Sequence, residues 1–268
     1  MSNNIKLIAS DLDGTLLNED KTIASENLEA IKKAREQGVL FTIATGRPLP
    51  STKRYYEITG ADVPMILYNG ALIYDGKTGK TISSVCLEPD DAIKILELAD
   101  ELGASACVWY DHKLYANKID ENVNEYKSLS GLEPIVIKDK KALAQKGIIK
   151  ILIHDTPQNL QNFVEKIRDV SFNNVTTCFS GKEYFEFFNK EVSKGVGLLR
   201  LCEYCGIKPQ EVLALGDAEN DKPMLKAAGI GVAMANGFPE TKAAADYITD
   251  DNESGGWAKA VNKFIFNK

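Results

Sequence analysis

The segment Ile8-Ala9-Ser10-Asp11-Leu12-Asp13-Gly14-Thr15 joins a short apolar run to two closely spaced carboxylates and a glycine. The apolar run, residues 5–10, predicts a buried strand of a parallel sheet. In an extended backbone, residues two apart point the same way, so Asp11 and Asp13 are expected to face one crevice. This crevice would lie at the carboxyl end of the strand, where open α/β sheets bind ligands. Gly14 then lets the chain turn away.

Taken alone, the two carboxylates leave two interpretations open. Their mutual repulsion favours a bound cation or a raised pKa on one of them, but a solvated Asp-rich turn would explain the pair equally well. A calcium-binding loop does not fit, because Thr15 and Thr22 stand where that loop needs an oxygen-rich residue and a bidentate glutamate.

On both sides of a central stretch, the sequence alternates apolar strands with helices. A helix is predicted to start at Ser25, its expected N-cap, and to stop at Gly38. A strand at 39–44, a helix at 52–59 and a strand at 65–68 follow. The alternation resumes with a helix from Ser193 to Gly206 and with strands at 212–215, 229–234 and 247–249. This pattern predicts a parallel sheet with right-handed crossovers.

The central stretch instead reads as helix-strand-strand units, which predict a separate α+β layer with an antiparallel sheet. The expected helices are 90–102, 120–130, 139–146 and 156–169, and the expected strands are 105–110, 113–117, 134–137, 147–154, 175–180 and 184–188. The 268 residues suffice for two modest domains. We therefore predict an α/β fold: a Rossmann-like parallel-sheet core, residues 1–83 and 189–268, interrupted by an inserted α+β cap domain, residues 84–188.

Three further loops follow predicted strands and carry groups that bind anions or cations. Thr45 and Gly46 offer a hydroxyl and a backbone amide to a phosphate oxygen. Lys194 opens a helix, so its ammonium and the helix N-terminus could act together on an anion. The segment Gly216-Asp217-Ala218-Glu219-Asn220-Asp221 is a hard oxygen site suited to Mg²⁺. Each signal is weak by itself, but four such loops, each directly after a predicted strand and in this order, are far more specific.

With these loops in this order, the sequence resembles the haloacid dehalogenase (HAD) superfamily. More narrowly it resembles the Cof-type phosphatases, which insert a large α+β cap (C2B-type) between the second and third motifs. Asp11 to Thr15 match the first motif, Thr45 the second, Lys194 the third, and Gly216-Asp217 with Asn220-Asp221 the fourth. The resemblance covers nearly the whole chain. Ala218, Ala235 and Ser254 depart from the usual residues without removing a group that the chemistry needs.

The resemblance implies a Mg²⁺-dependent phosphatase that hydrolyses phosphomonoesters of small metabolites, either sugar phosphates or phosphorylated cofactors, through an aspartyl-phosphate on Asp11. Mg²⁺ would be held by Asp11, the Asp13 backbone carbonyl and Asp217. The Asp13 carboxyl would stay off the metal and transfer protons. The phosphoryl oxygens would be bound by the Leu12 and Gly46 amides, Thr45, Lys194 and Asn220. Asp221 would orient Lys194 or a metal-bound water, and Arg47 is left open between a substrate contact and a salt bridge.

Two other functions remain open. A phosphomutase or phosphotransferase could use the same aspartyl-phosphate and pass the phosphoryl group to a second hydroxyl. A non-catalytic phosphometabolite-binding protein is the third possibility, and the complete set of catalytic residues argues against it, because binding alone needs no Asp13.

Composition restricts the partners. A net charge of −6 shows no basic surface for nucleic acid, and no apolar run is long enough to span a membrane. The residues before the first strand do not resemble a secretion signal, and five cysteines, an odd number, fit reduced thiols, so we expect a cytoplasmic protein. Cys202 and Cys205 are interpreted as structural thiols, and the two histidines do not suggest a catalytic triad. The expected partner is a small phosphorylated metabolite, and the protein is expected to be a monomer or a small homo-oligomer.

Overall fold

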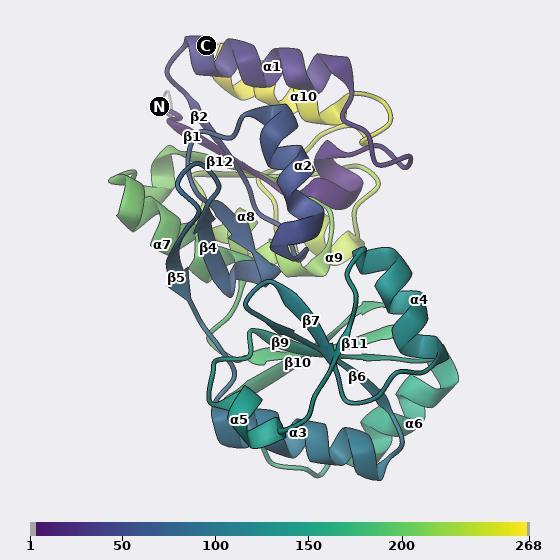
Figure 1. Ribbon diagram of the computed structural model, residues 1–268. Coiled ribbons are helices and arrows are strands. Elements are labelled where there is room, and N and C mark those ends of the chain that lie inside the picture. The colour runs from purple at the N-terminus through teal and green to yellow at the C-terminus, as the bar shows by residue number, and fades with distance from the viewer. Residues whose placement is uncertain (1–3, 267–268) are drawn as a thin grey trace. The chain divides into compact units, whose positions relative to one another are not determined.

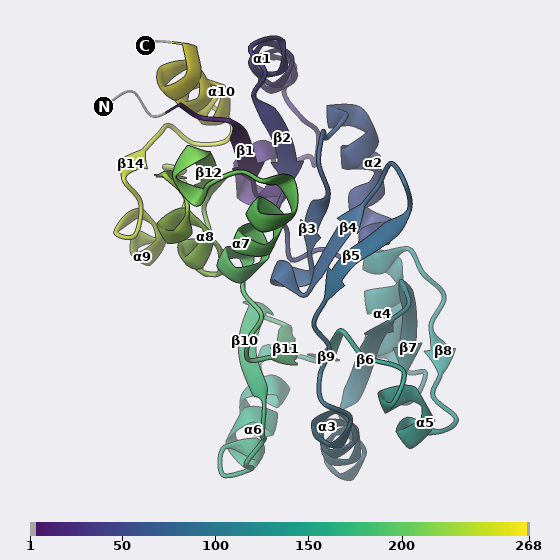
Figure 2. The ribbon, with the colours of Figure 1, turned by 90° about the vertical axis from the view of Figure 1, so that its left-hand side faces the viewer.

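The computed structural model describes residues 4–266, whose contacts divide into two compact units (Figures 1 and 2). The first unit comprises the described residues up to Arg47, then Thr52–Ser83 and the residues from Ser193 on. The second unit comprises Pro48–Ser51 and Ser84–Val192. None of the helices within residues 4–266 is long and apolar enough to cross a membrane.

The first unit is built on a five-stranded sheet in the order β14-β13-β12-β1-β2, and every neighbouring pair is parallel. The strands are β1 (Leu7–Ser10), β2 (Leu40–Ile43), β12 (Val212–Gly216), β13 (Ile230–Ala233) and β14 (Tyr247–Ile248). β1 lies between β2 and β12, and Ser10 at its end is level with Ile43 and Leu215. The predicted Rossmann-like core is thus confirmed, and the loops that follow these three strands start at one edge.

Helices cover both faces of this sheet. Leu7 and Ala9 of β1 belong to a core with α7 (Lys194–Cys205) and α8 (Lys222–Ala227). On the opposite face, α1 (Ser25–Glu36) lies beside α10 (Gly256–Val261), as Figure 1 shows. Trp257 of α10 donates its indole N–H to the Ser10 hydroxyl at 2.8 Å. The first unit also contains α9 (Pro239–Lys242).

Three local predictions needed correction. Ser25 is the first residue of α1 and not its N-cap, since Ala24 precedes the helix without a side-chain cap. α2 (Leu49–Thr59) starts earlier than expected. The strand expected at 65–68 joins the parallel sheet only through one bridge, Ala44 to Ile66. Instead, β3 (Met65–Leu67) forms a three-stranded sheet with β4 (Leu72–Asp75) and β5 (Lys80–Ser84), in the order β3-β4-β5. The hairpin of β4 and β5 was not predicted, although the glycine-containing turn at 76–79 is a hairpin signal.

The second unit contains a six-stranded sheet in the order β10-β11-β9-β6-β7-β8. Its strands are β6 (Ser105–Tyr110), β7 (Lys113–Ala116), β8 (Ile135–Val136), β9 (Lys150–His154), β10 (Val175–Gly181) and β11 (Tyr184–Asn189). α3 (Pro89–Glu101), α5 (Lys140–Ala144) and α6 (Pro157–Ile167) share one apolar core with one face of this sheet. The separate α+β unit is as predicted, but the sheet is mixed, because β7 and β8 are parallel. α4 (Glu121–Ser130) lies between them in sequence, and parallel neighbours need such a crossover.

Candidate active site

The loops that follow β1, β2 and β12 start together at the carboxyl edge of the parallel sheet. The Asp11 N–H donates to the Leu215 carbonyl at 3.0 Å, and the Ala44 N–H donates to the Ser10 carbonyl at 2.8 Å. These bonds continue the ladder one residue past each strand. Asp11 therefore starts its loop at a fixed position, with only 5% of its surface exposed.

A buried lysine joins the loops that carry Asp11 and Asp221. The Lys194 ammonium, 1% exposed, donates to Asp11 Oδ1 at 2.7 Å and to Asp221 Oδ1 at 2.6 Å. Burial alone would lower the pKa of Lys194, but the two carboxylates raise it above its ordinary value. Lys194 is placed there because the Ser193 side chain caps α7 and accepts the Val196 N–H at 3.1 Å. The lysine is thus a fixed cation.

The loop after β12 folds back on Asp221. Asp221 Oδ2 accepts the N–H groups of Asp217, at 3.0 Å, and of Ala218, at 2.9 Å. Gly216 is required here, because a Cβ at that position would lie 2.5 Å from Asp221 Cβ. Asp217 Oδ1 accepts the Thr15 hydroxyl at 2.9 Å, which ties this loop to the first one. Burial, followed by the charge of Asp221, raises the pKa of Asp217 to about 6.

The carboxylates of Asp11, Asp217 and Asp221 each offer an oxygen within 4.8 Å of the others. When all three carboxylates are ionised, they and the Lys194 ammonium carry a net charge of −2 in a largely buried site. Burial also raises the pKa of Asp11 well above its ordinary value, against the opposing effect of Lys194. A divalent cation would neutralise this surplus, and carboxylate oxygens are the donors that Mg²⁺ prefers. The residues present therefore fit a Mg²⁺ site.

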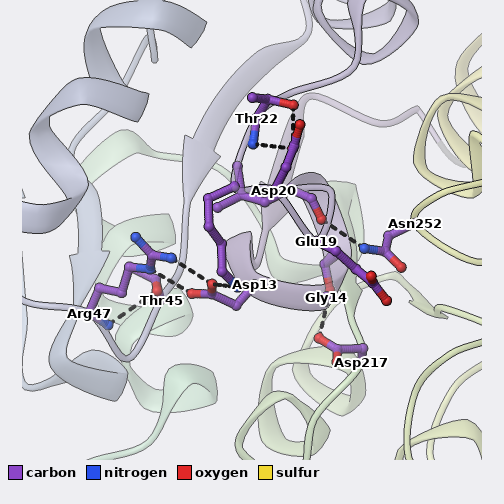
Figure 3. Close-up of polar contacts among 12 residues, drawn as sticks. Asp13, Gly14, Glu19, Asp20, Thr22, Thr45, Arg47, Asp217 and Asn252 are labelled. Atoms are coloured by element: carbon purple, nitrogen blue, oxygen red, sulfur yellow. Dashed lines mark hydrogen bonds and ion pairs between the residues drawn. The ribbon is translucent and has the colours of Figure 1, made fainter. Parts of the chain in front are cut away.

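Asp13 is turned away from this cluster. Its carboxylate pairs with Arg47, which donates from Nε to Oδ2 and from Nη2 to Oδ1, both at 2.6 Å. Lys21 Nζ adds a third hydrogen bond to Oδ1 at 2.9 Å. Figure 3 shows Asp13 facing Arg47, while Asp217 lies beyond Gly14. Burial would raise the pKa of Asp13, but the hydrogen bonds and charges of Arg47 and Lys21 hold it at about 2.

Of the two roles that the sequence left open for Arg47, the salt bridge is present in this structure, with Asp13 as the partner. Lys21 was not among the sequence-predicted site residues. Leu17 and Ile23 pair in an antiparallel bridge, so the chain between them turns back toward the first loop. Lys21 lies in this turn, with a φ of 65°, and contacts Asp13 from there. A positive φ at a lysine is uncommon and is not readable from the sequence.

The structure brings the predicted phosphate-binding groups Thr45, Gly46 and Asn220 around one residue that sequence reasoning did not single out for a role, Asn69. Its backbone N–H donates to the Thr45 carbonyl at 3.0 Å, and its Oδ1 accepts the Asn220 amide at 2.8 Å. A Cβ at position 46 would lie 2.8 Å from Asn69 Oδ1, so any larger residue there would displace the Asn69 side chain. The signal for Asn69 was the Asn-Gly dipeptide, which is typical of a left-handed turn, and its φ is 58°. Leu12, the remaining candidate, is fully buried.

A parallel α/β core, three loops at one sheet edge with a buried lysine from α7, and a separate α+β unit define a class of hydrolases. The chain belongs to that class, the haloacid dehalogenase-like hydrolases, whose family model matches residues 8–261. Within it, the chain is a Cof-type phosphatase of the HAD superfamily, as the motifs predicted.

The relatives agree with this assignment. A provisionally named phosphatase of Streptococcus pyogenes serotype M6 is 34% identical, over 98% of this chain and 100% of that protein. A 5-amino-6-(5-phospho-D-ribitylamino)uracil phosphatase of Bacillus subtilis is 28% identical, over 97% of each chain. The crystal structure of a haloacid dehalogenase-like hydrolase from Bacteroides thetaiotaomicron superposes with a TM-score of 0.86 at 27% identity, covering 97% of this chain and 99% of that one.

Proposed function

We propose that this phosphatase hydrolyses phosphomonoesters of small soluble metabolites in a Mg²⁺-dependent reaction, with Asp11 as the nucleophile. The observation that supports this most directly is the buried cluster of Asp11, Asp217 and Asp221 around Lys194, with its surplus charge of −2. A charge of that size in a buried site would be costly unless a cation or an ionic ligand completed it.

Asp11 and Asp217, with the Asp13 carbonyl, are the proposed metal ligands. Asp221 is the poorer ligand, since Lys194 and two backbone amides already donate to its oxygens. When bound, Mg²⁺ would supply two positive charges against the repulsion between the Asp11 carboxylate and a phosphate dianion.

In the proposed reaction, an Asp11 oxygen attacks phosphorus in line and the ester oxygen leaves with a proton from Asp13. Water then attacks the aspartyl-phosphate, and Asp13 takes up its proton. Lys194 holds Asp11 Oδ1 and adds positive charge at the phosphoryl group. The amides of Leu12 and Gly46, with Thr45 and Asn220, would bind the phosphoryl oxygens.

The position of Asp13 adds one requirement to this reaction. A carboxyl group whose pKa is about 2 carries no proton at neutral pH, so it cannot act as an acid while Arg47 and Lys21 both hold it. We infer that the pairing loosens once substrate is bound, when an anionic ligand can compete for the two cations.

The substrate is proposed to be a sugar phosphate or a phosphorylated cofactor or cofactor precursor. Three relatives from Bacillus subtilis are named 5-amino-6-(5-phospho-D-ribitylamino)uracil phosphatases, and their coverage extends over nearly this whole chain. Residues 84–188 are proposed to act as a cap that excludes water and reads the leaving group.

The test is release of inorganic phosphate from p-nitrophenyl phosphate and from a panel of sugar phosphates and phosphorylated cofactor precursors, with Mg²⁺ and with EDTA. We expect turnover only with the metal and none from Asp11→Asn. Asp20→Asn is the matched control, because Asp20 is an exposed carboxylate nearby that hydrogen-bonds only locally, to Thr22. Turnover in EDTA, or by Asp11→Asn, would refute the mechanism. Adding glycerol as a second acceptor tests the transferase alternative, which predicts glycerol phosphate in place of inorganic phosphate.

A further inference from the structure

The loop that carries Asp11 and Asp13 has an irregular backbone that cannot satisfy its own carbonyl groups in a regular ladder. Asp13 is extended, with ψ 126°, and Gly14 has φ 72° and ψ 0°. One internal bond, from the Leu17 N–H to the Leu12 carbonyl at 2.9 Å, closes the turn. Carbonyl groups outside helices and strands take their hydrogen bonds from other donors, and the direction of each carbonyl depends on those donors.

Three asparagine side chains supply these donors. The amide of Asn236 donates to the Gly14 carbonyl at 2.8 Å, and that of Asn252 donates to the Leu17 carbonyl at 2.8 Å. Asn27, which is fully buried in α1, donates to the Leu16 carbonyl at 3.3 Å. They come from three segments: the turn after β13, the loop before α10, and α1 itself. Figure 3 shows the Asn252 side chain directed toward the first loop.

Two of the asparagines are linked to each other. The Asn252 backbone N–H donates to Asn236 Oδ1 at 3.2 Å. One connected path therefore runs from the Gly14 carbonyl through Asn236 and Asn252 to the Leu17 carbonyl. Asn252 is 8% exposed, so loss of its amide would leave the Leu17 carbonyl without that donor in a largely dry environment.

The turn that carries Asn236 also contacts the other proposed metal-binding loop. The Phe238 N–H donates to the Asp217 carbonyl at 2.9 Å. A Cβ at Gly237 would lie 2.7 Å from the same carbonyl oxygen, so the turn is in close contact with it. The segment thus holds the backbones of Gly14 and Asp217 at once.

We propose that Asn27, Asn236 and Asn252 are positioning residues that fix the backbone of the first loop, and with it the direction of the Asp13 carbonyl, for metal binding. The inference rests on the proposed Mg²⁺ function. A donor is needed at each of these positions, because the partner is a carbonyl oxygen. Aspartate could not replace asparagine, since it would place two acceptors face to face and add charge beside a site that already carries −2.

The experiment measures Mg²⁺ binding by titration calorimetry in the absence of substrate, for wild type, Asn236→Ala and Asn252→Ala. Both changes are neutral, so neither alters the charge of the site. Outer partners of metal ligands typically change metal affinity by about 10- to 100-fold, and we expect a loss of roughly tenfold in each variant. Asn236 is exposed, so its variant tests the inference even if Asn252→Ala does not fold.

The matched control is Asn189→Ala in the second unit. Asn189 is 4% exposed and its side-chain amide donates to the Cys86 carbonyl at 3.0 Å. The variant therefore loses the same kind of hydrogen bond, far from Asp11 in sequence. Its Mg²⁺ affinity should equal that of wild type. If wild type binds Mg²⁺ but the two asparagine variants bind it equally well, the positioning role is wrong. If wild type itself shows no Mg²⁺ binding and no metal-dependent turnover, the proposed function fails instead.

Discussion

Replacement of Asp217 by asparagine should stabilise the metal-free protein while it weakens metal binding. The side chain keeps its shape, and its Oδ1 can still accept the Thr15 hydroxyl. What is lost is one of the three negative charges that surround Lys194. Because those charges exceed the lysine's charge by two, neutralising one of them relieves repulsion in the buried cluster.

The size of the effect follows from the pKa of Asp217, which is about 6 in the folded protein against an ordinary value of 3.8. A difference of one in pKa corresponds to about 1.4 kcal/mol, so the ionised side chain costs at most about 3 kcal/mol at neutral pH. Partial exposure of Asp217 reduces this figure, and we expect Asp217→Asn to gain about 1–3 kcal/mol in the free energy of unfolding.

The pH dependence gives a second check on the same variant. The folded-state pKa of Asp217 is raised, so the folded protein binds a proton that the unfolded chain releases between about pH 4 and pH 6. Wild-type stability is therefore lowered by this group as the pH rises through that window. The advantage of Asp217→Asn should be absent below pH ~4 and complete above pH ~6.

Urea unfolding in EDTA and in Mg²⁺, followed by circular dichroism, measures both effects. In Mg²⁺ the order should reverse, because wild type gains binding energy that Asp217→Asn lacks. Asp91→Asn is the control, because Asp91 is 2% exposed and accepts the backbone N–H groups of Asn173 and Asn174. This variant should lower the free energy of unfolding by the same amount in EDTA and in Mg²⁺. An Asp217→Asn protein that is less stable than wild type in EDTA, or that Mg²⁺ stabilises as much as wild type, would refute the charge argument.

Three further outcomes are expected. Lys194→Met should abolish turnover and lower the free energy of unfolding in EDTA by about 3–5 kcal/mol, because it leaves buried carboxylates unpaired. Adding Asp221→Asn to the Lys194→Met protein should restore part of the lost stability. Gly46→Ala should raise the KM for every phosphomonoester with little change in stability. The added Cβ would displace the Asn69 side chain, which also accepts a hydrogen bond from Asn220. Unchanged steady-state kinetics would contradict this. Lys21→Met should cost less than about 1 kcal/mol in urea unfolding, because its side chain is 50% exposed and Arg47 keeps both of its bonds to Asp13.

The class of fold, and the sheet edge that carries the candidate site, could be predicted from the sequence. Apolar runs followed directly by Asp11, Thr45 and Asp217 predicted parallel strands whose ends meet at one edge, and the register of β1 with β2 and β12 confirms that they do. This works because both signals are local: a buried strand must be apolar along its length, and a loop that follows it must start at its carboxyl end.

Contacts between distant segments were decided only in the tertiary structure. Nothing near Asp13 in sequence shows that Arg47 and Lys21 hold its carboxylate, or that the pKa therefore falls to about 2. Asn252 reaches the Leu17 carbonyl from 235 positions along the chain. Charge balance and carbonyl direction depend on which side chains lie in contact in space, and a single sequence does not show those contacts. The candidate residues of the site could thus be proposed from the sequence, while partners such as Lys21 and Asn252 could not.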